Sequence, residues 1–561
     1  MKTFLSLLLS LLPLSILSST PKPITVQPNT DKSRYTMVDS FGREVMYRGV
    51  NLMMINWNEI DGPNRPIDSE LYVNACPDNE SDNWTEPPIC EIDYGKINNP
   101  FEHDTSPNSQ NDLAQIREYG FDLIRLGVSW SILEPEPGVV NVKYLERVEQ
   151  VIEWGAHQGL DFFIDFHQDF YSSSLDGGGM DGAPPWAVLN QTINEYPKWK
   201  RAVLDKVGFA WQTVAAFKTF FDNLVSPVDT TNPKGIQERY IDTFATVVKY
   251  FNDTDAVIGF EIMNEPPPSE LNVVGFSDNI LYPFYRRVIQ AVTGVRDGMD
   301  DCESDNVVGN DCAHPDMMIH SKKLMIVEPM AVRNQLDFST QVSKPFTEYP
   351  SIVYAPHTYS YSFTILPLKI GGYERSLRTA CWEAQKIGAS VMVSEFGGGN
   401  GESGMEKLSN ITAQQDEHLV SSTFWVWKEN KGEGGWSVWS GIDGDDDQQQ
   451  DSWRRKYLSR IRPRLISGEL KEIKYDPEEG VMAMKAVGVG VGVGVGGGDD
   501  DDDNGLRTEI YVPVDLGNVS DDSIVVEGAA ELEGVEERGD GSRIVTVKVQ
   551  QAGGEYTVKI G

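Results

Sequence analysis

Short apolar runs alternate with amphipathic stretches over roughly 400 residues of the chain. Between the runs, apolar residues recur at helical spacing, as in residues 145–152, 241–248 and 377–387. Buried strands that alternate with helices indicate an α/β protein with a parallel sheet. Eight repeats favour a closed eight-stranded (β/α)8 TIM barrel, and no glycine-rich dinucleotide turn follows the first run. The predicted strands are residues 45–51, 122–128, 161–166, 257–263, 324–328, 352–356, 390–395 and 423–427.

The pattern changes near residue 455. Apolar runs at residues 510–514, 523–526, 542–550 and 556–560 are separated by turn residues, with no long helix between them. This predicts a small C-terminal antiparallel β-sandwich. A V-G repeat followed by five aspartates at residues 487–503 predicts a flexible surface insertion. We therefore assign residues 20–455 to the barrel and residues 456–561 to the sandwich.

The amino-terminal segment has the layout of a secretory signal peptide. Lys2 precedes an apolar run at residues 4–17, and small residues follow. The run is short for a membrane span, so an uncleaved anchor is the less favoured alternative. Residues 1–19 thus predict entry into the secretory pathway, ending outside the cell or in a lysosomal or vacuolar lumen. Glycosylation sequons begin at Asn79, Asn83, Asn190, Asn252, Asn410 and Asn518.

The chain contains five cysteines. Cys76 with Cys90, and Cys302 with Cys312, would each close a short loop in polar sequence, and we predict both disulfides. Cys381 lies in a helix-like stretch and is expected to be a buried thiol. The cysteine and histidine spacing does not match a zinc site.

The charge balance excludes some partners. The chain has 85 acidic and 48 basic residues and a formal net charge of −37. Such a surface repels phosphate backbones, so a nucleic-acid partner is disfavoured, whereas a neutral sugar remains compatible. The same charge and the lack of an evident basic patch speak against docking on anionic membranes.

Polar residues gather where the predicted strands end. In barrels of this type the functional residues lie at the carboxyl ends of the strands, and buried polar groups are costly unless they are paired or used. The pattern therefore predicts a functional site at that rim. The residues concerned are Asn51, Arg125, Asp165, His167, Asn264, Glu265, Glu328, His357, Tyr359, Glu395, Trp425 and Trp427.

Two glutamates stand out among them. Glu265 and Glu395 follow the fourth and seventh predicted strands, so one rim can hold both. Cleavage of a glycosidic bond uses such a pair, one as acid and one as nucleophile in a retaining enzyme. A nearby carboxylate raises the pKa of the acid and keeps it protonated. This chemistry needs neither a cofactor nor a metal.

Several motifs occur in a family-specific order. They are RGVN (48–51), DLIRLGVSW (122–130), EPEPG (134–138), DFHQDFYS (165–172), GAPPWA (182–187), GFEIMNEP (259–266), YAPHTY (354–359), SEFGG (394–398) and IRPRLISG (461–468). As a set they resemble glycoside hydrolase family five, in particular endoglycoceramidases and related glucosylceramide- and steryl-glucoside-cleaving enzymes. The resemblance implies a barrel with a C-terminal sandwich.

The resemblance also implies catalytic roles. Glu265 would be the acid/base and Glu395 the nucleophile. Asn264 would hydrogen-bond the sugar 2-hydroxyl, Tyr359 would donate to Glu395, and Arg125 would keep Glu395 ionised.

Further residues would shape the sugar pocket. Asp165 and His167 would bind hydroxyls, and His357 would lie beside Tyr359. Trp425 would form an apolar floor, although strand alternation leaves Trp427 as an alternative.

One family feature is missing. A lysine that helps to bind the sugar often follows RGVN, but the aligned position here is Ile55. This leaves the sugar specificity open. The aromatic-rich segment 186–221 would either line a groove for acyl chains or pack on the barrel as an amphipathic helix.

The leading hypothesis is a secreted retaining β-glycosidase that hydrolyses a glycosphingolipid or a similar lipid glycoside. It allows peripheral contact with lipid assemblies and requires no obligate protein partner. A β-glucanase or mannanase of the same family is the first alternative. A non-catalytic carbohydrate-binding protein is the second, although binding alone does not require two glutamates at strand ends.

Overall fold

The computed structural model describes most of the chain. The described residues are 20–53, 109–176, 182–207, 210–269, 275–295, 319–340, 344–359, 372–399, 401–427, 436–440, 449–450, 452–488, 504–516 and 519–561. Features that lie outside them are the signal segment 1–19, Ile55, most of the insertion 487–503, and Cys76, Cys90, Cys302 and Cys312. Cys381 is a half-buried thiol, and burial raises its pKa to about 11. Within the described part of the chain, no helix is both long and apolar enough to cross a bilayer.

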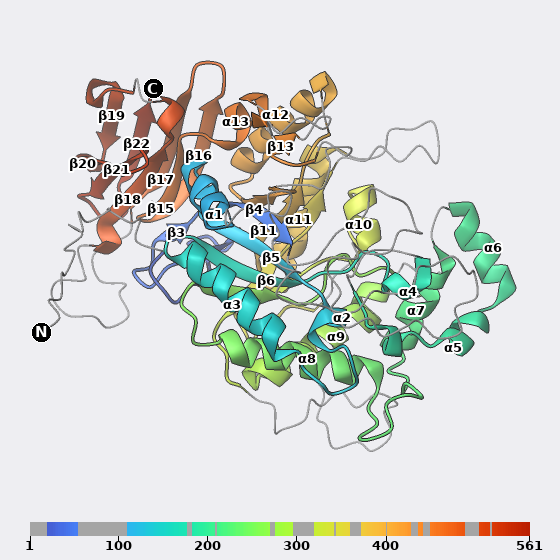
Figure 1. Cartoon of the computed structure of the whole chain (residues 1–561). Coiled ribbons are helices and arrows are strands. Elements are labelled where there is room, and N and C mark those ends of the chain that lie inside the picture. Colours follow the sequence, from blue (N-terminus) through green and yellow to red (C-terminus); the bar gives the residue numbers. More distant parts are fainter. Residues whose placement is uncertain are drawn as a thin grey trace, which may run out of the picture.

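The centre of the molecule is a closed parallel barrel (Figure 1). Each barrel strand pairs in parallel with the next, β12 pairs with β4, and β11 pairs with β9, which closes the ring. The predicted eight-stranded barrel is therefore confirmed. Its strands are β4 (Arg48–Met53), β5 (Leu123–Val128), β6 (Asp161–Phe166), β7 (Val257–Glu261), β8 (Leu324–Val327), β9 (Ile352–Tyr354) with its short continuation β10 (His357–Thr358), β11 (Ser390–Phe396) and β12 (Ser421–Phe424).

Helices surround the barrel and bury their apolar faces against it. In α8, for example, Phe244, Val247 and Val248 recur at helical spacing and are buried. The predicted helical patterns correspond to α3, α8 and α11. The α-helices are α1 (Ser109–Glu118), α2 (Trp130–Leu133), α3 (Val142–Ala156), α4 (Ser173–Asp176), α5 (Asn190–Asn194), α6 (Lys198–Val207), α7 (Trp211–Phe221), α8 (Ile236–Phe251), α9 (Tyr282–Thr293), α10 (Ala331–Leu336), α11 (Tyr373–Ile387), α12 (Gly401–Glu417) and α13 (Ser452–Leu458).

Strand alternation and strand register place the polar residues at the same height along the barrel axis. On β5, Leu123 belongs to the apolar core inside the barrel, and Arg125, two residues later, is on the same face. The parallel pairing aligns Asn51 with Arg125, Asp165 with Glu261, and His357 with Glu395. Polar side chains from distant parts of the sequence therefore meet at the carboxyl end of the barrel, as the strand-end pattern predicts.

Two antiparallel sheets follow the barrel and enclose a separate apolar core. The four-stranded sheet has the order β16-β17-β22-β19 and the larger one β1-β2-β3-β15-β18-β21-β20. Their strands are β1 (Thr25–Pro28), β2 (Tyr35–Val38), β3 (Glu44–Val45), β15 (Arg462–Ile466), β16 (Glu469–Asp476), β17 (Val481–Val487), β18 (Arg507–Val512), β19 (Ile524–Gly528), β20 (Ala530–Glu537), β21 (Arg543–Val549) and β22 (Glu555–Ile560).

The larger sheet includes the amino-terminal strands. The sequence predicts that residues 20–455 form the barrel, whereas β1–β3 join the C-terminal sheet because Val45 of β3 pairs with Leu465 of β15. The predicted strand 45–51 therefore divides into the end of β3 and most of β4. Long-range pairing of this kind leaves no local signal in the sequence.

Buried ion pairs join the sandwich to the barrel. Asp122, which directly precedes β5, lies 2.7 Å from Arg462 and 3.3 Å from Arg464. Asp416 of α12 lies 2.7 Å from Arg460. Removing one member of a buried pair is costly, so these contacts fix the two units relative to one another.

Candidate active site

Arg125 lies at the centre of the polar cluster and is fully buried. Its Nη1 donates to Glu395 Oε1 at 2.6 Å and to Asn51 Oδ1 at 3.0 Å. Its Nε and Nη2 donate to the two oxygens of Glu261. Burial alone would lower the pKa of Arg125, but the surrounding carboxylates outweigh it and hold this pKa well above its ordinary value. Nη2 also contacts Asn264, Asp165 and Glu328 at 2.7, 3.1 and 3.3 Å.

The structure brings Glu265 and Glu395 together. Nδ1 of His357 lies 2.7 Å from Glu265 Oε1 and 3.3 Å from Glu395 Oε2. Because one nitrogen contacts both carboxylates, these two oxygens lie within about 6 Å of each other. Glu265 comes from the loop after β7 and Glu395 from β11, at the same end of the barrel. The spatial premise of the two-glutamate prediction is met.

The environment shifts the pKa values of the two glutamates in opposite directions. Burial raises the pKa of both carboxyls because it disfavours the charged form. At Glu265 the charge and hydrogen bond of His357 outweigh burial, and the pKa falls below its usual range. At Glu395 burial prevails over His357 and Arg125, and the pKa is raised. Both directions are opposite to the expectations from the sequence, which were a raised pKa for the acid Glu265 and a Glu395 kept ionised by Arg125. His357 stabilises the charged form of Glu265, and the burial of Glu395 outweighs the effect of Arg125.

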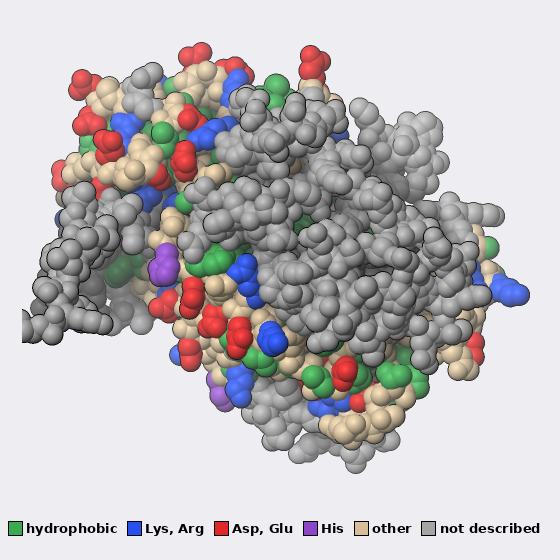
Figure 2. All heavy atoms as spheres, viewed as in Figure 1, with side chains coloured by type: hydrophobic (Ala, Val, Ile, Leu, Met, Phe, Trp, Pro, Cys, Tyr) green, Lys and Arg blue, Asp and Glu red, His purple; other side chains and the backbone are tan. Residues whose placement is uncertain are grey.

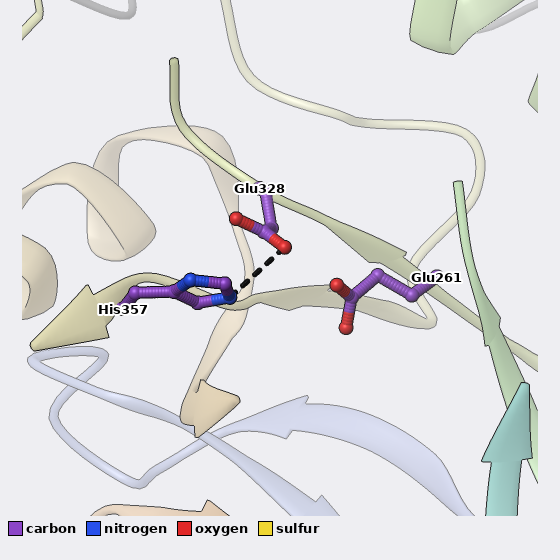
Figure 3. A group of neighbouring side chains, drawn as sticks. All are labelled: Glu261, Glu328 and His357. Carbon is purple, nitrogen blue, oxygen red and sulfur yellow. Dashed lines mark ion pairs between the residues drawn. The ribbon is translucent and has the colours of Figure 1, made fainter. Parts of the chain in front are cut away.

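Glu328 contacts both the His357 ring and the backbone of Glu265. Its Oε1 is 3.1 Å from His357 Nε2, and its Oε2 accepts a hydrogen bond from the backbone N–H of Glu265 at 3.2 Å. Glu261 is the last residue of β7 and Glu328 directly follows the adjacent strand β8, and Figure 3 shows the His357 ring facing Glu328. Glu328 therefore contacts the ring and the backbone that position Glu265.

The cluster of Glu261, Glu328 and His357 also contains the kinds of atoms that bind metals. One ligand atom from each lies within 4.8 Å of the others. However, Arg125 Nη2 already lies 2.5 Å from Glu261 and 3.3 Å from Glu328. Since a guanidinium lies where a cation would bind these carboxylates, the residues do not fit a metal.

The charge state of His357 leads to a prediction. Burial alone would lower the pKa of His357, but Glu328, Glu395 and Glu265 together raise it well above its usual value. A raised folded-state pKa stabilises the fold below the unfolded pKa of about 6.5, and this stability is lost as the pH rises through the folded-state value. We expect the His357→Gln variant to be less stable than wild type below about pH 6.5, with the difference shrinking at alkaline pH.

Denaturant unfolding of both proteins across this pH range measures the difference. The control is the His157→Gln variant, which is changed at an exposed position after α3. Its free energy of unfolding should equal that of wild type at every pH. A stability loss in His357→Gln that is the same at every pH would contradict a charge effect.

Tyr359 and Asn264 lie beside the two glutamates. The hydroxyl of Tyr359 donates to Glu395 Oε2 at 2.6 Å, as predicted from the resemblance. The edge of Trp436 packs against the Tyr359 ring at 5.4 Å. Asn264 accepts from Arg125 and donates from Nδ2 to the backbone oxygen of Gln168 at 2.8 Å. Its amide orientation is thereby set.

His167 and Trp425 form a second side of the site. The two rings stack at 5.4 Å with an interplanar angle of 12°. Nδ1 of His167 contacts Asp165 Oδ2 at 2.7 Å. Asp165 is fully buried and also contacts Arg125, so it orients these two side chains. This burial does not favour the direct contact between Asp165 and a sugar hydroxyl that the sequence analysis expects.

The structure distinguishes Trp425 from Trp427. Trp427 is fully buried, its Nε1 donates to Asp112 of α1 at 3.3 Å, and its ring packs against Tyr119. β12 ends at Phe424, so strand alternation does not extend to these tryptophans. Of the two, Trp425 is the one at the site.

Some site residues have no role in the sequence analysis. Glu261 could have been found, because it is an acidic residue inside a predicted buried strand. Asn334 of α10, which donates to Glu265 Oε1 at 3.4 Å and accepts from the backbone of His357, has no such signal. Trp436 likewise reaches Tyr359 only through the tertiary fold.

The aromatic-rich segment 186–221 packs mainly as core. Phe217 and Phe220 of α7 are buried, and Trp211 and Phe221 pack partly buried against the same core. A cavity of about 20 Å³ lies between this helix and His167, with Phe217, Phe220 and Met263 in its wall. A space of this size holds about one water molecule, so it does not accommodate an acyl chain.

The fold and the site point to a glycoside hydrolase, and comparison with known families agrees. The model of the cellulase family, glycosyl hydrolase family 5, matches residues 90–431. The chain therefore belongs to glycosyl hydrolase family 5 and is a glycoside hydrolase.

Individual relatives are similar at low identity. Endoglycoceramidase I of Rhodococcus hoagii is 23% identical over 468 residues, which cover 80% of both chains. A glucosylceramidase of Rhizopus delemar is 25% identical over 42% of this chain, which spans only 35% of that longer protein. The solved structure of endo-glycoceramidase II from Rhodococcus sp. in complex with ganglioside GM3 has a TM-score of 0.63 at 20% identity, covering 94% of this chain and 99% of that chain. Its barrel and C-terminal sandwich agree with the fold described above.

Proposed function

We propose that this protein is a retaining β-glycosidase that hydrolyses a glycosphingolipid or a related lipid glycoside, with Glu395 as nucleophile and Glu265 as acid/base. The observation that carries the mechanism is the shared contact with His357, which keeps the two carboxylate oxygens within about 6 Å. Retaining enzymes hold their carboxyl groups about 5–5.5 Å apart, whereas inverting enzymes separate them by about 6.5–9.5 Å.

In the first step, a carboxylate oxygen of Glu395 bonds to the anomeric carbon as the bond to the aglycone oxygen breaks. Arg125 and Tyr359 each donate to Glu395 at 2.6 Å and hold it in place. Glu265 protonates the departing oxygen as this bond breaks, and His357 Nδ1, 2.7 Å from Glu265 Oε1, supplies that proton to Glu265.

In the second step, Glu265 takes a proton from water, the water oxygen attacks the anomeric carbon, and Glu395 is released. Once Glu395 is esterified, its negative charge is gone. Asn264 would bind the sugar next to the reacting carbon, and its contacts with Arg125 and the Gln168 backbone support this role. Trp425 offers a ring face to the sugar.

Similarity supports the lipid glycoside as substrate. Relatives named as endoglycoceramidase and glucosylceramidase match the chain, and a structural neighbour was solved with ganglioside GM3. The signal-like segment 1–19 supports action in the secretory pathway.

A substrate panel tests this proposal. Purified protein is incubated with ganglioside, glucosylceramide, steryl glucoside and cello-oligosaccharides, and products are separated by chromatography. Release of ceramide or sterol is expected, and early NMR spectra should show the sugar first as the β-anomer. Cleavage of the oligosaccharides alone would favour the glucanase alternative, and α-anomer release would contradict retention.

A further inference from the structure

A lobe of short helices projects from the rim of the barrel. Residues 168–235, between β6 and α8, contain α4 to α7. Figure 1 shows this lobe at the right of the molecule, with α6 at its outer edge. The lobe follows directly after His167, so it begins at the candidate active site.

Hydrogen bonds connect the lobe to the catalytic loop. Gln168 Nε2 donates to the backbone oxygen of Glu265 at 3.2 Å, and its Oε1 accepts from the backbone of Tyr171 at 3.1 Å. Thr213 on α7 donates to the backbone oxygen of Phe170 at 3.3 Å. The lobe is thus held against the site, and its outer face has a defined position relative to the rim.

The outer helix α6 has an unusual composition for this chain. Its sequence KWKRAVLDKV carries four cationic residues and one acidic residue, in a protein of net charge −37. Leu204 is buried, whereas Lys198 and Trp199 face outward. Arg201 lies over the Trp211 ring at 4.1 Å and joins α6 to α7. Figure 2 shows Lys and Arg side chains at the projecting edge where Figure 1 places α6.

Exposed aromatic rings accompany these charges. The Trp199 side chain is 64% exposed. Phe170, three residues after His167 on the rim, is 47% exposed. Large exposed rings are unfavourable in water unless a partner covers them, and tryptophan is enriched where a membrane meets water.

The combination of tryptophan and cations suits a lipid surface with negative headgroups. A basic helix with an outward tryptophan inserts its ring at the interface while its cations bind anionic lipids. The acidic remainder of the protein does not prevent this, because salt screens charges beyond about 8–10 Å. No basic patch is evident in the sequence as a whole, because the large negative net charge conceals one helix of opposite sign.

We propose that α6 docks the protein on an anionic lipid surface through Trp199 and the neighbouring cations. Docking would hold the active-site rim beside the membrane in which a glycolipid lies. The binding itself does not depend on the proposed function, whereas its benefit to catalysis does.

Vesicle sedimentation tests the docking directly. Full-length protein is mixed with phosphatidylcholine vesicles that contain or lack phosphatidylserine. Binding is expected only with phosphatidylserine and should weaken with added salt. The Trp199→Ala and Lys198→Glu/Lys200→Glu variants should each bind at least about tenfold more weakly.

Two matched controls separate docking from general effects of these substitutions. Trp382→Ala removes a tryptophan on α11 that is 44% exposed and lies 4.1 Å from the Lys386 amine. Lys143→Glu/Lys249→Glu reverses two exposed charges on α3 and α8. Both controls should bind like wild type. The proposal would be overturned if the controls lost as much vesicle binding as the α6 variants, or if the α6 variants bound like wild type. It would also be overturned if the wild-type protein did not bind the vesicles.

Activity measurements distinguish this proposal from the proposed function. The α6 variants should hydrolyse a soluble aryl β-glycoside like wild type, but should act at least about tenfold more slowly on glycolipid in anionic vesicles. Equal rates on vesicles would contradict productive docking. Vesicle binding without hydrolysis of any glycolipid would leave docking intact and contradict only the proposed substrate.

Discussion

The Glu395→Gln variant is expected to fold like wild type and to lose activity by roughly four orders of magnitude or more, the scale seen when a covalent nucleophile is removed. Glutamine keeps the shape of the side chain and can still contact Arg125 and Tyr359. It cannot form the glycosyl ester that the first step requires. Initial rates on an aryl β-glycoside and on a glycolipid measure the loss, and circular dichroism checks the fold.

The Glu265→Ala variant provides the contrast that separates the two roles. An acid catalyst matters less when the leaving group is already acidic. We therefore expect Glu265→Ala to retain much of its first-step rate on a dinitrophenyl glycoside and to lose most of its rate on a lipid glycoside. The two roles would be reversed if Glu395→Gln showed this dependence on the leaving group and Glu265→Ala lost activity equally on all substrates.

Replacing Arg125 with Met is expected to cause the largest loss of stability. The guanidinium contacts Glu261, Glu395 and Asp165 in a fully buried position. Methionine would remove the guanidinium that these three carboxylates share, and breaking a buried charge pair typically costs about 3–5 kcal/mol. Because the folded variant would then bind protons more readily than the unfolded chain, its deficit relative to wild type should be largest near neutral pH and shrink in acid.

An exposed arginine provides the matched control for this experiment. Arg507 donates to Glu533 at 2.6 Å, and both side chains are partly exposed. Arg507→Met should cost less than about 1 kcal/mol, because water replaces the lost contact. Denaturant unfolding at several pH values measures both variants. A small, pH-independent deficit in Arg125→Met would contradict the central charge role of Arg125.

Local patterns in the sequence predicted the barrel and the level at which its site lies. Strand alternation gives Arg125 the same face as Leu123, and short-range motifs identify Glu265 and Glu395 at strand ends. These features can be predicted from the sequence because they depend on the period of a strand and on residues a few positions apart. The C-terminal strands were also evident in outline from their apolar runs.

Other features depend on contacts between distant segments. Alternation along the last barrel strand could not separate Trp425 from Trp427, because β12 ends before both. The support that Asn334 and Glu328 give to Glu265 comes from different loops and strands. Composition averaged over the chain concealed the basic helix α6, whose placement at the outer edge of a lobe is a tertiary property.

The helices and strands, the barrel and the residue types at its rim follow from local periodicity and burial, so they can be predicted from the order of amino acids. Which carboxylates contact His357, which strands complete the sandwich and which charges face outward together become known only when the chain is folded. Pairing energies act through space, whereas the pattern along a chain records only neighbours in sequence.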